Sequence, residues 1–231
     1  MLKRRVSIFL VIIAVAALAV EVILPQAVAA LVGHSLSRMT GDSQVSVTAQ
    51  SRPACRMLAG QFDLLAVDGD EVKIDKLTFS RVTMRLERVE LDIASLYSQR
   101  RLMLKSAANI DLTAVISQEE LSRHLNRDVK GVRNAQVTVT PEKTTVSGEV
   151  GLPGVAQVAV NMEGRIVADG QQIKFVTQRV GVTQIALGKI TGSTTTEILL
   201  ADLNKAPFPV HLQQLEMEQG RVMVRAAGQV P

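Results

Sequence analysis

The residue types that most often carry catalysis or bind metals are few and scattered in this chain. Its three histidines, His34, His124 and His211, fall on different predicted elements and lack the spacing of a zinc site or a catalytic triad. We expect each to be a surface or helix-end residue. Gly33–Ser37 lacks the final glycine of a nucleophile elbow, and Gly188–Gly192 lacks the spacing of a phosphate-binding loop. The sequence therefore offers no assembled catalytic site.

The acidic residues and the single cysteine have structural explanations. Asp68–Glu71 lacks the ligand order of a calcium loop, so we interpret its carboxylates as solvated turn acids. Glu119 and Glu120 lie at a predicted helix start, where negative charge is favourable. Cys55 has no partner for an intramolecular disulfide and is expected to be a small buried residue. We predict no cofactor, no metal and no enzymatic activity.

The composition argues against two classes of binding protein. Lys and Arg number 26 against 22 Asp and Glu, and no basic cluster is interleaved with aromatic residues, so a nucleic-acid partner is not expected. Five Phe, one Tyr and no Trp leave few rings for stacking against sugars. The apolar residues are mainly Val, Leu, Ile, Ala and Met, which either pack a core or line an adaptable surface for acyl chains.

The first 24 residues predict export. Lys3, Arg4 and Arg5 precede an uninterrupted apolar run, Val6–Val20, and positive charge ahead of such a run stays in the cytoplasm. Segment 1–24 nearly contains the ~20 apolar residues that a membrane span needs. We therefore expect a single-pass anchor in the cytoplasmic membrane, with the body on the extracytoplasmic side. A signal peptide cleaved near residue 29, within small residues, is the alternative.

Hydrophobic periodicity predicts the elements that follow. Apolar residues recur at helical spacing from Pro25 until Gly41. Residues 45–49 alternate as a strand does, and a short helical turn is expected after Pro53. From Phe62 to Ile93, apolar residues lie two apart in sets whose phase slips. This pattern indicates bulges in a curved sheet that has one charged, solvent-exposed face.

The rest of the chain predicts two further helices and six strands. Ser117–Glu120 reads as a capping box that opens a helix with Leu121 and Leu125 on its apolar side. The next expected strands are Ala135–Thr140, Thr144–Leu152, Ala156–Ala168 and Gln171–Val182. A third helix is expected from about Gly188 to Leu203. A last hairpin is expected to pair Phe208–Glu218 with Arg221–Ala227. We predict an α+β fold in which a long curved antiparallel sheet wraps around amphipathic helices, as a single domain over residues 25–231.

Long, one-sided strands and amphipathic helices enclose an aliphatic trough, which either holds lipid or is a closed core. If it holds lipid, acyl chains contact the apolar faces of the first helix and of the long strands. The candidate contact residues are Leu31, Leu36, Val158, Val160, Met162, Ile173 and Phe175. Each of them is equally explained as ordinary core, so both interpretations stay open here.

Three segments resemble the LmeA-like phospholipid-binding family. They are Ala206–Leu212, Gly60–Asp63 and Ser117–Leu121, within a similarity that covers about residues 25–228. The resemblance implies an exported, membrane-associated phospholipid-binding protein of the cell envelope. It also implies a fold like one half of bactericidal/permeability-increasing protein, the TULIP architecture, in which a curved sheet encloses an acyl-chain groove. The rival hypothesis is an envelope scaffold whose core is filled by its own side chains and whose surface binds a protein.

Overall fold

The structure is a computed structural model that describes residues 21–37, 44–74, 77–99, 102–129, 131–150, 158–185, 188–192, 197–206 and 208–231. The chain divides into two compact units. The first unit comprises residues 1–68, 84–110 and 229–231, and the second comprises residues 69–83 and 111–228. Residues 1–20 of the predicted anchor lie outside the described residues. Among the helices that are described, none has the length and apolar character needed to cross a membrane.

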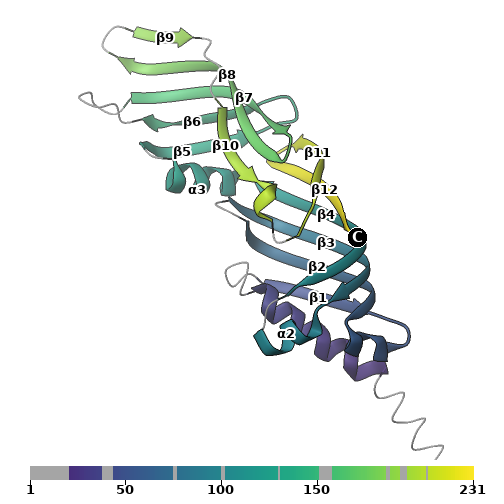
Figure 1. The fold of residues 1–231 in the computed structure, drawn as a ribbon. Coiled ribbons are helices and arrows are strands. Elements are labelled where there is room, and N and C mark those ends of the chain that lie inside the picture. Colours follow the sequence, from purple (N-terminus) through teal and green to yellow (C-terminus); the bar gives the residue numbers. More distant parts are fainter. Residues whose placement is uncertain are drawn as a thin grey trace, which may run out of the picture. The chain divides into compact units, whose positions relative to one another are not determined.

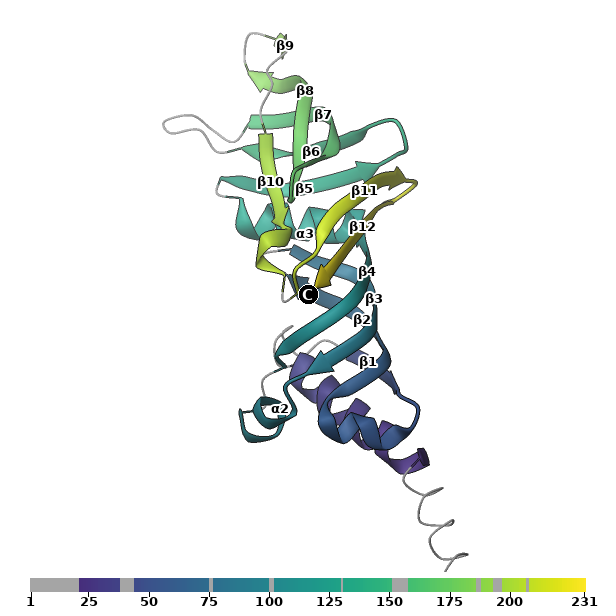
Figure 2. The ribbon, with the colours of Figure 1, turned by 45° about the vertical axis from the view of Figure 1, so that its right-hand side comes forward.

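Most described residues lie in two six-stranded sheets (Figures 1 and 2). The strand order of the first sheet is β1 (Gln44–Gln50), β2 (Gln61–Ile74), β3 (Leu77–Leu91), β4 (Leu104–Ser117), β12 (Arg221–Val230) and β11 (His211–Glu218). The order of the second is β10 (Glu197–Asp202), β8 (Gln172–Ile185), β7 (Val158–Asp169), β6 (Thr144–Val150) and β5 (Val132–Val139), with β9 (Gly188–Gly192) paired to β8. The predicted α+β class is confirmed, and so are the predicted hairpins β5–β6, β7–β8 and β11–β12.

One phase slip in each of two long strands, β2 and β3, occurs at a residue with an unusual backbone conformation. In β3, alternate residues are buried from Val82 to Leu86, and burial resumes out of phase at Val89. Arg88, inside the slip, has φ 50°, in the left-handed region that non-glycine residues rarely adopt. Glu71 has φ 55° just before buried Val72 in β2. The irregularities predicted from the slips are therefore present in both strands.

Three helical segments belong to the first unit. The helix predicted from Pro25 is present over residues 21–37, and the predicted helical turn is η1 (Ala54–Ala59), a 3-10 helix. Cys55 is exposed, so the prediction that it is buried was wrong. A 3-10 helix repeats every three residues, and its buried positions are Ala54 and Met57, which leaves Cys55 on the outer side.

The third of these segments, α2 (Ile93–Gln99), was not predicted. Ile93 continues an alternating apolar pattern, which predicts a strand residue at that position. The strand ends before it, because the Asp92 carboxylate accepts hydrogen bonds from the Ser95 amide at 3.1 Å and from the Ser95 hydroxyl at 2.8 Å. These bonds stabilise the first turn of the helix and lower the pKa of Asp92 below its ordinary value. Strand β4, which follows, was also missed.

In the second unit, helix α3 (Gln118–Asp128) lies beside β5 (Figures 1 and 2). The predicted N-cap is confirmed, since the Ser117 hydroxyl accepts a hydrogen bond from the Glu120 amide at 3.2 Å. The reciprocal half of the capping box is replaced: the Ser117 amide donates to the Ser80 hydroxyl at 3.1 Å. The Glu120 carboxylate instead pairs with Arg123, one turn along the helix.

The third helix predicted from Gly188 to Leu203 is absent, and the prediction was wrong. Its described residues form β9, β10 and the short 3-10 helix η2 (Leu203–Lys205), while residues 193–196 lie outside the described residues. Both strands pair with β8, where Val182 lies opposite Ile190 and Phe175 opposite Ile198. β-branched residues favour strands, and the pairing positions that β8 offers outweigh the weak helical periodicity.

Candidate functional site

The second sheet has one apolar face, built from alternate residues of neighbouring strands. In β7, Val160 lies opposite Gly148 of β6 and Val182 of β8, while Met162 lies opposite Val146 and Val180. Successive side chains of a strand point to opposite faces, and paired residues share a face. The candidate residues Val158, Val160 and Met162 therefore share their face with Ile166 farther along the same strand.

A bulge in β8 keeps this face apolar along its whole length. Glu163 pairs with Arg179 and the next residue, Gly164, pairs with Thr177, so Gln178 is the additional residue. An extra residue shifts the alternation of its strand by one position. As a result, Val180 and Val182 on one side of the bulge share a face with Ile173 and Phe175 on the other. Counting by two from Phe175 would assign Val180 and Val182 to the opposite face.

Helix α3 covers one part of the apolar face and closes it. Leu121 and Leu125 of the helix, with 2% and 4% of their surface exposed, face Ile166 and Phe175. The gap that remains among them measures only about 10 Å³, less than one water molecule occupies. Ile173 and Phe175 are 0% and 3% exposed. This part of the face is packed like an ordinary core.

The other part of the face is only half-buried. Val160 and Met162 of β7 and Val180 and Val182 of β8 all have intermediate exposure. Val158, the first residue of β7, is buried, with 4% of its surface exposed. Because large side chains in a packed core are nearly always fully enclosed, an aligned group of half-buried aliphatic residues is a surface that a further apolar group can cover.

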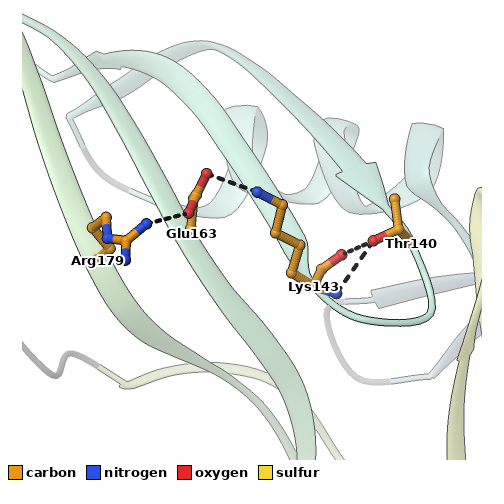
Figure 3. Close-up of polar contacts among 4 residues, drawn as sticks. All are labelled: Thr140, Lys143, Glu163 and Arg179. Atoms are coloured by element: carbon orange, nitrogen blue, oxygen red, sulfur yellow. Dashed lines mark hydrogen bonds and ion pairs between the residues drawn. The ribbon is translucent and has the colours of Figure 1, made fainter.

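On the opposite, polar face, an ion network joins the strands at the bulge. The Glu163 carboxylate accepts hydrogen bonds from Lys143 at 2.9 Å and from Arg179 at 3.3 Å (Figure 3). The Thr140 hydroxyl donates to the Lys143 carbonyl at 2.8 Å, which fixes the turn that carries the lysine. The hydrogen bond from Lys143, with the nearby positive charges, lowers the pKa of Glu163 below its ordinary value. The network ties β7 and β8 together beside Gly164.

The first unit contains a separate apolar pocket of about 270 Å³. Three helical segments line it: residues 21–37, η1 and α2. The lining residues are Leu24, Ala27, Val28, Leu31, Met57, Leu58, Ile93 and Leu96. The candidate residue Leu31 is thus at the pocket and is 41% exposed, whereas Leu36, on the same helix, is 3% exposed. Sequence reasoning missed Leu58 and Ile93, because the first lies in a single helical turn and the second was assigned to a strand.

The seven predicted contact residues fall into three environments. Leu31 lines the first-unit pocket, Val160 and Met162 lie on the half-buried sheet face, and the remaining four, Leu36, Val158, Ile173 and Phe175, are buried. Leu31 and Leu36 belong to the first unit, and the five strand residues belong to the second. The candidates thus belong to two apolar regions, one in each unit.

Within the described residues, no group of three or more His, Cys, Asp or Glu side chains that could hold a metal ion is found. His34 and His211 are exposed, as predicted. His124 is 4% exposed, so its prediction as a surface or helix-end residue was wrong. Like Leu121 and Leu125, it is one of the buried residues of α3, and its Nδ1 lies 3.0 Å from the Asp128 carboxylate. A polar partner one turn away offsets the cost of burying the polar ring.

A half-buried aliphatic sheet face and an aliphatic pocket are the features of a protein that binds apolar ligands. The family model for LmeA-like phospholipid-binding proteins matches residues 15–227. The chain therefore belongs to the LmeA-like phospholipid-binding family, as the sequence resemblance indicated. No characterised protein and no solved structure gives a significant match to the chain.

Proposed function

We propose that this protein binds the acyl chains of phospholipids on the half-buried apolar face of its second sheet, without catalysing a reaction. The observation that carries the proposal is the aligned group Val160, Met162, Val180 and Val182, which is aliphatic and incompletely covered. Membership of a phospholipid-binding family supplies the class of ligand. In this proposal Ile173 and Phe175 support the site from the covered part of the same face.

The energetics of such a site favour the chain over the headgroup. Burial of apolar surface contributes about 25 cal/mol per Å², so an acyl chain that covers the exposed parts of several aliphatic side chains gains several kcal/mol. An exposed ion pair contributes only about 0–1 kcal/mol. The charges of the chain are nearly balanced. Headgroups are therefore held loosely, and the acyl chain determines affinity.

The proposed place of action is the outer face of the cytoplasmic membrane. Lys3, Arg4 and Arg5 ahead of Val6–Val20 support an anchor with the body exported. From there the protein shuttles or holds lipids of the cell envelope. The rival function, a scaffold with a self-filled core, draws support from the part of the face that α3 closes, and it predicts that no lipid accompanies the protein.

Native mass spectrometry of the full chain, purified from membranes in mild detergent, tests the proposal. We expect phospholipid to remain bound to the wild-type protein. The variants Val160→Trp and Met162→Trp place a large ring on the proposed surface and lose the lipid. Asn161→Trp is the matched control, because Asn161 lies between them on the opposite, exposed face. A wild-type protein without lipid, or tryptophan variants that retain it while folded, would contradict the proposal.

A further inference from the structure

The pocket of the first unit has an apolar floor and an open, apolar rim. Met57 and Leu96, which are 0% and 2% exposed, belong to the floor. Leu31 and Leu58 are 41% and 64% exposed and form the rim. All the side chains that line the pocket are apolar. Water therefore gains no hydrogen bonds there, and an apolar ligand replaces it at a net gain.

Large exposed apolar side chains concentrate on two of the helical segments that line this pocket. Of the six in the described residues, four come from the helix over residues 21–37 and from η1: Val22, Ile23, Leu31 and Leu58. Single exposed apolar residues are common on protein surfaces, but a group of them marks a surface that contacts an apolar partner. A partner that covers this group must contact both the helix over residues 21–37 and η1.

Chain continuity and a polar contact point to a lipid bilayer as that partner. The helix that lines the pocket follows directly on Val6–Val20, the predicted anchor. Glu21 separates the two, and its Oε1 accepts a hydrogen bond from the Ala54 amide at 3.0 Å. This bond ties the first described turn of the helix to the start of η1, so the two walls of the pocket are joined where the apolar run ends. Acyl chains would be within reach of the rim.

We propose that the pocket takes the end of one acyl chain of a bilayer phospholipid, which enters between Leu31 and Leu58. The inference rests on the proposed anchoring and on the proposed phospholipid binding. The predicted anchor that precedes the helix selects this occupant over a partner protein, because it holds the rim beside a bilayer. The pocket measures about 270 Å³ and is lined by apolar side chains alone, as the end of an acyl chain requires.

Photo-crosslinking of the full chain in phosphatidylglycerol vesicles tests this inference. The probe is phosphatidylglycerol with a photoactivatable group near the end of one acyl chain, and crosslinked peptides are mapped by mass spectrometry. We expect crosslinks to Met57 and Leu58 in η1 and to Ile93 and Leu96 in α2. Ala27→Trp fills the pocket and lowers their yield about tenfold, the effect of losing the burial of a few methylenes.

The matched control is Ala30→Trp, because Ala30 lies on the same helix but lines a different hollow, which it shares with β1. Its crosslinks match those of the wild type. Leu58→Ser is a second variant at an exposed position, which leaves the fold intact and also lowers the yield. Unchanged η1 and α2 crosslinks in Ala27→Trp and Leu58→Ser would overturn the inference.

The crosslink map also separates this inference from the proposed function. Crosslinks confined to β7 and β8 would overturn the pocket assignment and leave the sheet-face proposal standing. Crosslinks confined to η1 and α2 would support the pocket and contradict the sheet face. If phosphatidylglycerol crosslinks to neither region, both proposals fall.

Discussion

The two units expose apolar surface in different ways. In the first, three helical segments surround a pocket of about 270 Å³ whose rim residue Leu58 is 64% exposed. In the second, strands present a continuous face, and α3 covers only part of it. Side chains radiate from helices, so helices that meet leave a bounded gap, whereas a sheet aligns its side chains in long rows. The volume of the pocket limits the length of acyl chain that it can bury. The cover provided by α3 limits the part of the sheet face that a ligand can contact.

Chain length offers the strongest test of this difference. Each methylene removed from water contributes about 0.8 kcal/mol, so two fewer methylenes weaken binding roughly tenfold while the chain still contacts protein. In Ala27→Trp, where only the sheet face is left, affinity should keep rising with chain length. In Val160→Trp, where only the pocket is left, it should level off at short chains. Fluorescence binding with phospholipids of one headgroup and graded chains measures both series.

The same titrations at low and high salt supply the control. Apolar burial is insensitive to salt, and exposed ionic contacts are weak, so the affinities of both variants should change little. A steep salt dependence with no effect of chain length would point to a surface charge site. Identical length profiles in the two variants would remove the distinction between pocket and face.

The next largest effect is expected at Gly164, in the bulged part of the second sheet. An added Cβ there would lie 2.2 Å from the Val176 carbonyl oxygen and 2.9 Å from the Phe175 ring. Gly164→Ala should therefore destabilise the protein by about 1–3 kcal/mol, the usual cost of overpacking. Gly181→Ala is the matched control on the neighbouring strand, since its nearest atom is at 3.6 Å.

Hydrogen exchange during denaturant titration measures where that loss is felt. Protection should fall in β7 and β8 of Gly164→Ala, while the helix over residues 21–37 and η1 keep theirs. Equal loss of protection in both units would mean that they unfold as one cooperative body. The two units would then differ in their exposed apolar surfaces but not in their stability.

A smaller effect is expected at buried hydroxyls, of which each unit has one without a hydrogen-bond partner among the described residues. Thr177 in the second unit is 0% exposed and Ser51 in the first is 6% exposed. A buried polar group without a partner is unfavourable, so the isosteric change Thr177→Val should stabilise by about 1 kcal/mol. Ser51→Ala should gain less, because it also removes volume. Thermal unfolding measures both, and a destabilised Thr177→Val would reveal a partner for the hydroxyl.

Local sequence signals predicted the fold where one side chain decides the structure. Ser117 caps α3 through its own hydroxyl, and the turns of the hairpins follow from their short polar segments. Two failures differ in kind. At α2 the deciding side chain is also local, but Asp92 stands inside an alternating apolar pattern that predicts a strand. β9 and β10 instead depend on β8 being available to pair with. In β9 and β10, pairing between separate strands outweighs local propensity.

The candidate site was only partly predictable for the same reason. Alternation identified Val160 and Met162 correctly as residues of one face. It gave no means of telling them from Ile173 and Phe175, because burial of the latter depends on α3 packing against that part of the face. The bulge at Gln178 hid the contribution of Val180 and Val182, since one extra residue reverses the phase of the strand.

The smallest expected effect is the pH dependence of the network at Glu163. The hydrogen bond from Lys143 and the charge of Arg179 place the pKa of Glu163 below its ordinary value of 4.5. A carboxyl whose pKa is lower in the folded state stabilises the protein above its unfolded pKa, and this contribution disappears as the pH falls through the lower, folded pKa. The group is only partly buried and therefore screened by solvent, so the effect is small.

Glu163→Gln should therefore match the wild type in acid and be slightly less stable at neutral pH, with the difference confined to β7 and β8. Asp92 offers the matching test in the first unit, where hydrogen bonds from Ser95 lower the pKa in the same way. Replacing this carboxylate in Asp92→Asn should change how the stability of α2, and not that of β7 and β8, depends on acid pH. Hydrogen exchange from pH 3 to pH 7 resolves the two regions. A Glu163→Gln protein that follows the wild type at every pH would show that the network leaves the stability of the bulge unaffected, and that the backbone ladder and the apolar face fix β7 against β8 without it.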